Sequence, residues 1–125
     1  MVSSRIVDRF FGAALIIAAL GHLFGSFGKY AVGSSELVWA VSASVLAILL
    51  AAINLLRISR PDDKTLAWIC LAGCIAWIVL ALAFNVSIGS IFDPRGLTHA
   101  IVTAVLAFFS LRTLRGATGR ERGTI

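Results

Sequence analysis

Two histidines stand out in this 125-residue chain because their surroundings are almost entirely apolar. His22 lies in the stretch "ALGHLFGSFGKY", and His99 lies near the start of the last apolar run. An imidazole buried in hydrocarbon needs a hydrogen-bond partner, because an unmatched polar group is costly there. The pair therefore predicts one of three arrangements: a structural bond between helices, ligation of a metal or haem b, or a cavity for protons or a ligand.

The spacing of the histidines from basic residues predicts that both rings lie at one depth. Arg9 precedes His22 by the same number of residues as His99 precedes Arg112. At about 1.5 Å per helical residue, each ring lies roughly 20 Å from the basic boundary. The first and last helices of an up-down bundle are neighbours. We therefore expect the two imidazoles to meet on adjacent antiparallel helices.

Other polar residues are expected in the same half of the membrane as the histidines. Such residues either form a solvated rim with helix caps or complete a site. A site of this kind suits an anionic or amphiphilic ligand, and the two histidines are also candidate haem ligands. The candidate ligand-binding residues are His22, His99, Ser26, Lys29, Asn85 and Thr103.

Small residues surround His22 on the expected helix. Gly21 and Gly25 form a Gly-x-x-x-Gly pattern, which lets two membrane helices approach closely. We therefore expect these glycines to form a helix-packing surface, within the chain or in a homodimer. Trp77 is expected near mid-membrane, where its indole N–H needs a partner within the bundle.

The elements that position these residues are four apolar stretches. The chain is 59% hydrophobic and 14% charged, which leaves too little polar surface for a soluble domain of this size. Spans at about residues 10–30, 37–56, 66–88 and 94–114 approach the ~20 residues that cross a bilayer. Asp93-Pro94 is typical of an N-cap followed by the first helical residue. The sequence therefore predicts an all-α, four-helix transmembrane bundle with up-down-up-down topology, forming one domain over residues 1–114.

The basic residues predict the orientation of this bundle. Only Lys29 and Arg95 fall in the first and third connections, and the others flank the cytoplasmic side under the positive-inside rule. Both termini are therefore expected in the cytoplasm, with a disordered basic tail over residues 115–125. The expected location is a multi-pass membrane protein, in the inner membrane if the source is bacterial. Because the basic residues sit at the ends of apolar runs, no nucleic-acid partner is expected.

Sequence motifs do not indicate an enzyme. The chain carries no protease, hydrolase, phosphate-loop or dinucleotide-binding motif, and no carboxylate is expected inside a span. Cys70 and Cys74 are interpreted as small buried apolar residues. The favoured hypothesis is a non-catalytic accessory or scaffold subunit of a membrane complex. The alternatives are a b-type haem electron-transfer protein with axial ligands His22 and His99, and a small transporter of protons or an amphiphilic ligand.

Overall fold

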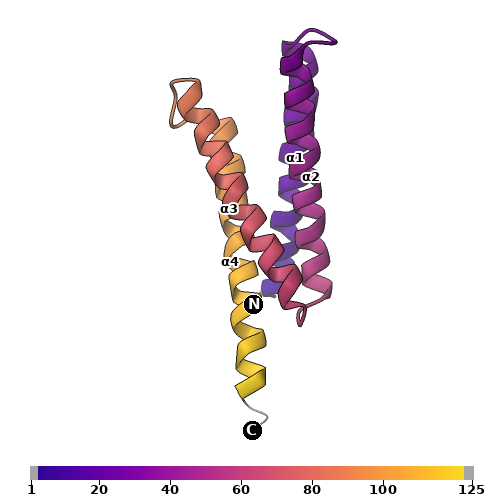
Figure 1. Cartoon of the computed structure of the whole chain (residues 1–125), viewed down its shortest axis with the longest axis vertical. Helices are drawn as coiled ribbons and strands as arrows, with labels where there is room; N and C mark the ends of the chain where they lie inside the picture. Colours follow the sequence, from indigo (N-terminus) through magenta and orange to yellow (C-terminus); the bar gives the residue numbers. More distant parts are fainter. Residues whose placement is uncertain (1–2, 123–125) are drawn as a thin grey trace.

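The computed structural model describes residues 3–122, with side chains over residues 3–116, and consists of four helices joined by short connections (Figure 1). All four helices are long and apolar enough to cross a membrane, α4 over Pro94–Gly116. The expectation of an all-α chain with four apolar helices is confirmed, and the chain is compatible with a small multi-pass membrane protein. The helices are α1 (Ser4–Lys29), α2 (Ser35–Ser59), α3 (Lys64–Ser87) and α4 (Pro94–Arg122).

Short polar side chains begin the helices. Each accepts a hydrogen bond from a backbone N–H of the first turn, which otherwise has no partner within the helix. Asp63 accepts from Leu66 at 2.9 Å, and Asp93 accepts from the N–H of Arg95 at 3.0 Å. Pro94 is the first residue of α4, directly after the capping Asp93, as the sequence predicts. Ser3 and Ser34 cap α1 and α2 in the same way.

Two helices are longer than the sequence analysis expects. The cap at Ser3 starts α1 before residue 10, so Asp8 lies inside the helix. This corrects the expectation that no span contains a carboxylate. At the other end of the chain, α4 continues to Arg122, so residues 115–122, expected in a disordered tail, are helical. Each added residue of an established helix gains a backbone hydrogen bond without a new nucleation cost. Residues 123–125 of that tail lie outside the described residues.

The helices form two hairpins that diverge. α1 packs mainly on α2 and α3 mainly on α4, whereas α2 and α4 barely touch. Figure 1 shows the hairpins meeting near the connection at residues 60–63 and separating toward the connections at residues 30–34 and 88–93. We call the first of these regions the closed end and the second the open end.

Side chains from all four helices fill the core between the two ends: Leu15, Leu50, Ala51, Cys74 and Leu106. Cys74 and Cys70 are fully buried free thiols. The closest helix approaches in this region use Gly12 and Gly73. A Cβ on Gly12 would lie 2.6 Å from Leu55, and one on Gly73 would lie 2.8 Å from Leu50. These two glycines therefore allow α1 and α3 to approach α2 closely in this region.

Buried polar groups pair with one another toward the closed end. Arg57 donates two hydrogen bonds to the Asp8 carboxylate, at 2.8 and 3.0 Å, and a third to Thr113 at 3.0 Å. Arg57 is one of the basic residues expected to flank the cytoplasmic side, but its side chain is only 2% exposed. Farther up, Ser110 of α4 donates to Asn54 of α2 at 3.3 Å. These bonds join both hairpins through four buried side chains, Asp8, Arg57, Asn54 and Ser110, and the half-buried Thr113.

Candidate functional site

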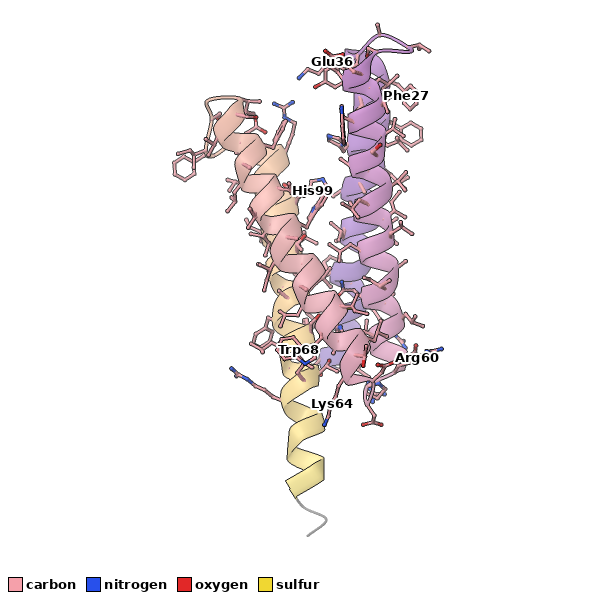
Figure 2. All side chains as sticks on the ribbon, viewed as in Figure 1. Phe27, Glu36, Arg60, Lys64, Trp68 and His99 are labelled. Atoms are coloured by element: carbon pink, nitrogen blue, oxygen red, sulfur yellow. The ribbon has the colours of Figure 1, made fainter. Side chains whose placement is uncertain are left out.

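The two imidazoles lie together between the hairpins. The ring centroids of His22 on α1 and His99 on α4 are 6.3 Å apart, with the ring planes at 83°. Figure 2 shows His99 in the space that separates α3 and α4 from α1 and α2. Phe27, by contrast, points away from the opposite hairpin in the same view and is 54% exposed. The histidines therefore face the interior of the molecule, and Phe27 lies on its outer surface.

A hydroxyl of the neighbouring helix fixes the His22 ring. Nδ1 of His22 is 2.9 Å from Oγ of Ser44, whose own hydrogen is donated to the Ala40 carbonyl at 3.1 Å. The direction of the bond between Nδ1 and Oγ depends on the tautomer of the His22 ring, and the other ring nitrogen, Nε2, takes the complementary role.

An indole fixes both the ring and the tautomer of His99. Nε1 of Trp77 is 3.3 Å from Nδ1 of His99, and an indole nitrogen can only donate. Nδ1 of His99 is therefore the acceptor, and Nε2 carries the hydrogen of the neutral ring. The backbone carbonyl of Ala18 on α1 lies beside this ring. The indole N–H of Trp77 thus has the partner within the bundle that the sequence leads us to expect.

Two cavities meet at this pair. One, of about 430 Å³, lies between α1 and α4, and the other, of about 380 Å³, lies between α2 and α3. We call the two together the cleft. The side chains that line both cavities come from three helices: His22, Phe84, Arg95 and His99.

The two cavities of the cleft differ in chemistry. The α1–α4 cavity has two cations, Lys29 and Arg95, with the hydroxyls of Ser26, Tyr30 and Thr98. The α2–α3 cavity is lined mainly by apolar surface, including Trp39, Leu46, Ala47, Trp77, Leu80 and Ala81. A molecule with a polar or anionic head and an apolar body matches this pair of environments.

An ion pair holds the shared cation at the open end. Arg95 donates to the Asp93 carboxylate through Nε at 2.9 Å and Nη2 at 3.0 Å. Hydrogen bonds from the Arg95 side chain, and then from its backbone N–H, lower the pKa of Asp93 below its ordinary value of 3.8. Asp93 thus remains ionised at neutral pH and orients the guanidinium beside the cleft.

Gly21 and Gly25 do not pack helices together within the chain, and their packing in a homodimer stays a prediction. Both line the α1–α4 cavity, and a Cβ on either would meet no atom within 4 Å. Because the hairpins diverge here, the missing side chains leave space instead of allowing a close approach.

The remaining predicted residues divide into two groups. Ser26 and Lys29 line the cleft, although the Ser26 hydroxyl is also bonded to the His22 carbonyl at 2.7 Å. Thr103 and Asn85 are fully buried outside the lining. The Thr103 hydroxyl donates to the backbone carbonyl of His99, and the Asn85 amide donates to the carbonyls of Ile91 and Asp93. These two side chains therefore support the backbone around the site and do not face a ligand.

The ligand-binding candidates chosen from the sequence do not include Ser44, Phe84 and Arg95, which also line the cleft. Ser44, Phe84 and Arg95 come from different helices or helix ends, and no spacing rule along one helix connects them with the histidines. Arg95 carries the one detectable signal, because it adjoins the capping Asp93 near the expected depth of His99. Its contact with both cavities depends on how α4 is rotated.

Comparisons with protein-family models, with curated proteins and with solved structures gave no match to this chain. Among the residues that the structure describes, no three His, Cys, Asp or Glu side chains form a group suited to a metal ion. The geometry of the cleft therefore provides the basis for inferring function.

Proposed function

We propose that this chain is a small multi-pass membrane protein that binds an amphiphilic ligand with an anionic head group in the cleft. In this proposal the four helices cross the bilayer in alternating directions, with both termini in the cytoplasm. The supporting evidence is the basic residues, of which only Lys29 and Arg95 belong to the open end. The cleft then opens in the outer half of the membrane.

The observation that carries the proposal is the meeting of two unlike cavities at one group of side chains. Arg95 and Lys29 attract an anionic head, and His22 offers a ring nitrogen for a hydrogen bond to an acid or hydroxyl group. The α2–α3 cavity, with Trp77 in its wall, accepts an apolar body. Such a ligand reaches both cavities past the histidine pair without leaving a charge in lipid.

Haem ligation fits these contacts poorly. A haem iron needs the lone pair of one ring nitrogen, and the other nitrogen then carries a hydrogen that it donates. At His99, Nδ1 accepts from Trp77, so the hydrogen of the neutral ring occupies Nε2. We therefore favour ligand binding over the b-type haem alternative. A haem protein would instead show a Soret band that is lost in His22→Ala and His99→Ala.

Tryptophan quenching tests the proposal directly. A variant with Trp39→Phe and Trp68→Phe keeps only Trp77, which lines the cleft. In phosphatidylcholine nanodiscs, a brominated long-chain fatty acid should quench Trp77 saturably, because bromine in the apolar cavity lies beside the indole. Replacing Arg95 with Gln should weaken the apparent affinity about tenfold, the effect of losing one charge-assisted hydrogen bond.

A matched control uses Trp68, which lies near the closed end and is 59% exposed (Figure 2). In a variant with Trp39→Phe and Trp77→Phe, quenching of Trp68 should rise linearly with the concentration of the same brominated fatty acid and show no saturation. Equal, unsaturable quenching of Trp77 and Trp68 would overturn the proposal. Tolerance of both histidine changes together with co-purification of a protein partner would then support the accessory-subunit hypothesis.

A further inference from the structure

A third cavity lies at the closed end, on the opposite side of the core from the cleft. Its volume is about 350 Å³, and α1, α2 and α4 all contribute to its wall. We call it the basic cavity, because it contains three arginines against two aspartates. It is lined by Ser4, Arg5, Asp8, Arg57, Ile58, Pro61, Asp62, Phe109, Arg112, Thr113 and Gly116.

Arg57 forms the buried part of this wall. Its Nη2 holds both oxygens of Asp8, and its Nη1 donates to Thr113. Its Nε is buried without a hydrogen-bond partner among the described residues, and the guanidinium also interacts with the buried Cys70 thiol of α3. Arg57 therefore forms the inner wall of the cavity, and the exposed arginines remain to bind an added anion.

The charges around Arg57 leave the basic cavity positive. Asp8 is neutralised by its ion pair, so Arg5 and Arg112 remain with Asp62. These two arginines come from α1 and α4 and are exposed, whereas Arg57 is 2% exposed. Guanidinium groups approaching from separate helices can bind several oxygens of one anion.

We propose that the basic cavity binds a phosphate group. A phosphate offers several acceptor oxygens to the exposed guanidinium groups of Arg5 and Arg112, which line this cavity from two helices. Its source is the head group of an anionic lipid or a free phosphate. Basic pockets between membrane helices on the cytoplasmic side suit anionic head groups, the side on which the proposed orientation places this end.

Thermal unfolding of the full-length protein in maltoside detergent tests this site. Dioleoyl phosphatidylglycerol, inorganic phosphate and dioleoyl phosphatidylcholine are added separately. Phosphatidylglycerol at about ten times its Kd should raise the Tm by about 5 °C, and phosphatidylcholine should not. Arg112→Gln and Arg5→Gln should each remove at least half of that rise. Arg57→Gln is avoided, because it also breaks the ion pair with Asp8.

The matched control is Arg60→Gln. Arg60 adjoins the same connection and is exposed, but it is not part of the cavity lining (Figure 2). It should keep the full rise in Tm. An equal rise with inorganic phosphate would support the site with free phosphate as its source, and a rise with the lipid alone would support the lipid head group.

Two results would overturn the proposal: no rise with either phosphate compound, or the same loss in Arg60→Gln as in Arg112→Gln. The second result would mean that general surface charge attracts the lipid. This test does not involve the cleft, so failure here leaves the proposed function intact, and the reverse also holds.

Discussion

The two ends of the molecule treat buried polar groups in opposite ways. At the closed end, Asp8 of α1 and Arg57 of α2 form an ion pair, and a hydrogen bond from Arg57 to Thr113 joins the pair to α4. At the open end, His22 and His99 are each bonded to a neighbouring helix but still face a cleft. The comparison shows how one small chain uses polar side chains both to join helices and to keep a space between them.

The glycines of the two regions also differ in what surrounds them. Gly12 lies where α1 packs on α2, and Gly73 lies where α3 approaches α2, so a side chain on either would collide with a leucine. Gly21 and Gly25 lie where the hairpins have separated, and a side chain there would meet nothing. The same residue type thus permits contact in one region and leaves a cavity in the other, because the distance between helices differs.

The largest effect is expected from breaking the closed-end ion pair. Asp8→Asn leaves the buried guanidinium of Arg57 without its counter-charge, and the free energy of unfolding should fall by about 3–5 kcal/mol. Titration with sodium dodecyl sulfate in mixed micelles measures this change. Asp93→Asn, which removes the exposed ion pair at the open end, should cost far less because water screens it.

A double variant sharpens this prediction. Asp8→Leu combined with Arg57→Met removes both charges, so it should be less destabilised than Asp8→Asn alone. Equal losses in Asp8→Asn and Asp93→Asn would contradict the contrast between the two ends.

Glycine substitutions should give the next largest effect. A Cβ on Gly96 would lie 2.8 Å from the Ala81 carbonyl and overlap the Asn85 amide. Gly96→Ala should therefore reduce the free energy of unfolding by about 1–3 kcal/mol. Gly21→Ala meets no atom and should cause no loss. The same detergent titration compares them, and a larger loss in Gly21→Ala would mean that this glycine packs against a second chain.

A smaller effect is expected at the core hydrogen bond between the hairpins. Ser110→Ala removes the bond to Asn54 and should cost about 0.6 kcal/mol, the average for such bonds in membrane proteins. Ser42→Ala is the control, because the Ser42 hydroxyl bonds only to the Val38 carbonyl of its own helix. If both variants lose the same amount, the Asn54 bond contributes nothing to joining the hairpins.

The smallest effect concerns pH. Because the pKa of Asp93 is lower in the folded chain than its ordinary value of 3.8, the folded state binds the proton less tightly than the unfolded state. The stabilisation by the Asp93–Arg95 pair is therefore present above that pH and is lost as the pH falls through the folded pKa. The difference in Tm between wild type and Asp93→Asn should be constant near neutrality and disappear in acid. A difference that persists at the lowest pH would contradict this assignment.

Regular features along the chain made much of the fold predictable. Apolar runs bounded by Ser34, Asp63 and Asp93 locate helices α2 to α4, because capping depends on residues within one turn. Equal spacing from basic residues was enough to suggest that His22 and His99 share a depth. The early start of α1 was missed, because a single cap at Ser3 outweighs the weak apolar character of the residues that follow.

The missed features all require knowledge of a neighbouring helix. Nothing near Arg57 in the sequence indicates that Asp8, far away along the chain, neutralises it. Ser44 and Trp77 likewise bond to the two histidine rings from two other helices. Asn85 and Thr103 lie outside the lining of the cleft, because their side chains bond to backbone carbonyls instead.

The sequence by itself determined that the chain forms four apolar helices and that Asp93-Pro94 begins the last of them. Both depend on local hydrogen bonding and on transfer of side chains from water, which act through residue type and short spacing. Only the tertiary structure decided that the hairpins diverge, that glycines line a cavity and that Asp8 joins Arg57. These outcomes depend on side-chain volumes meeting across helices distant in sequence, and no property of one helix specifies them.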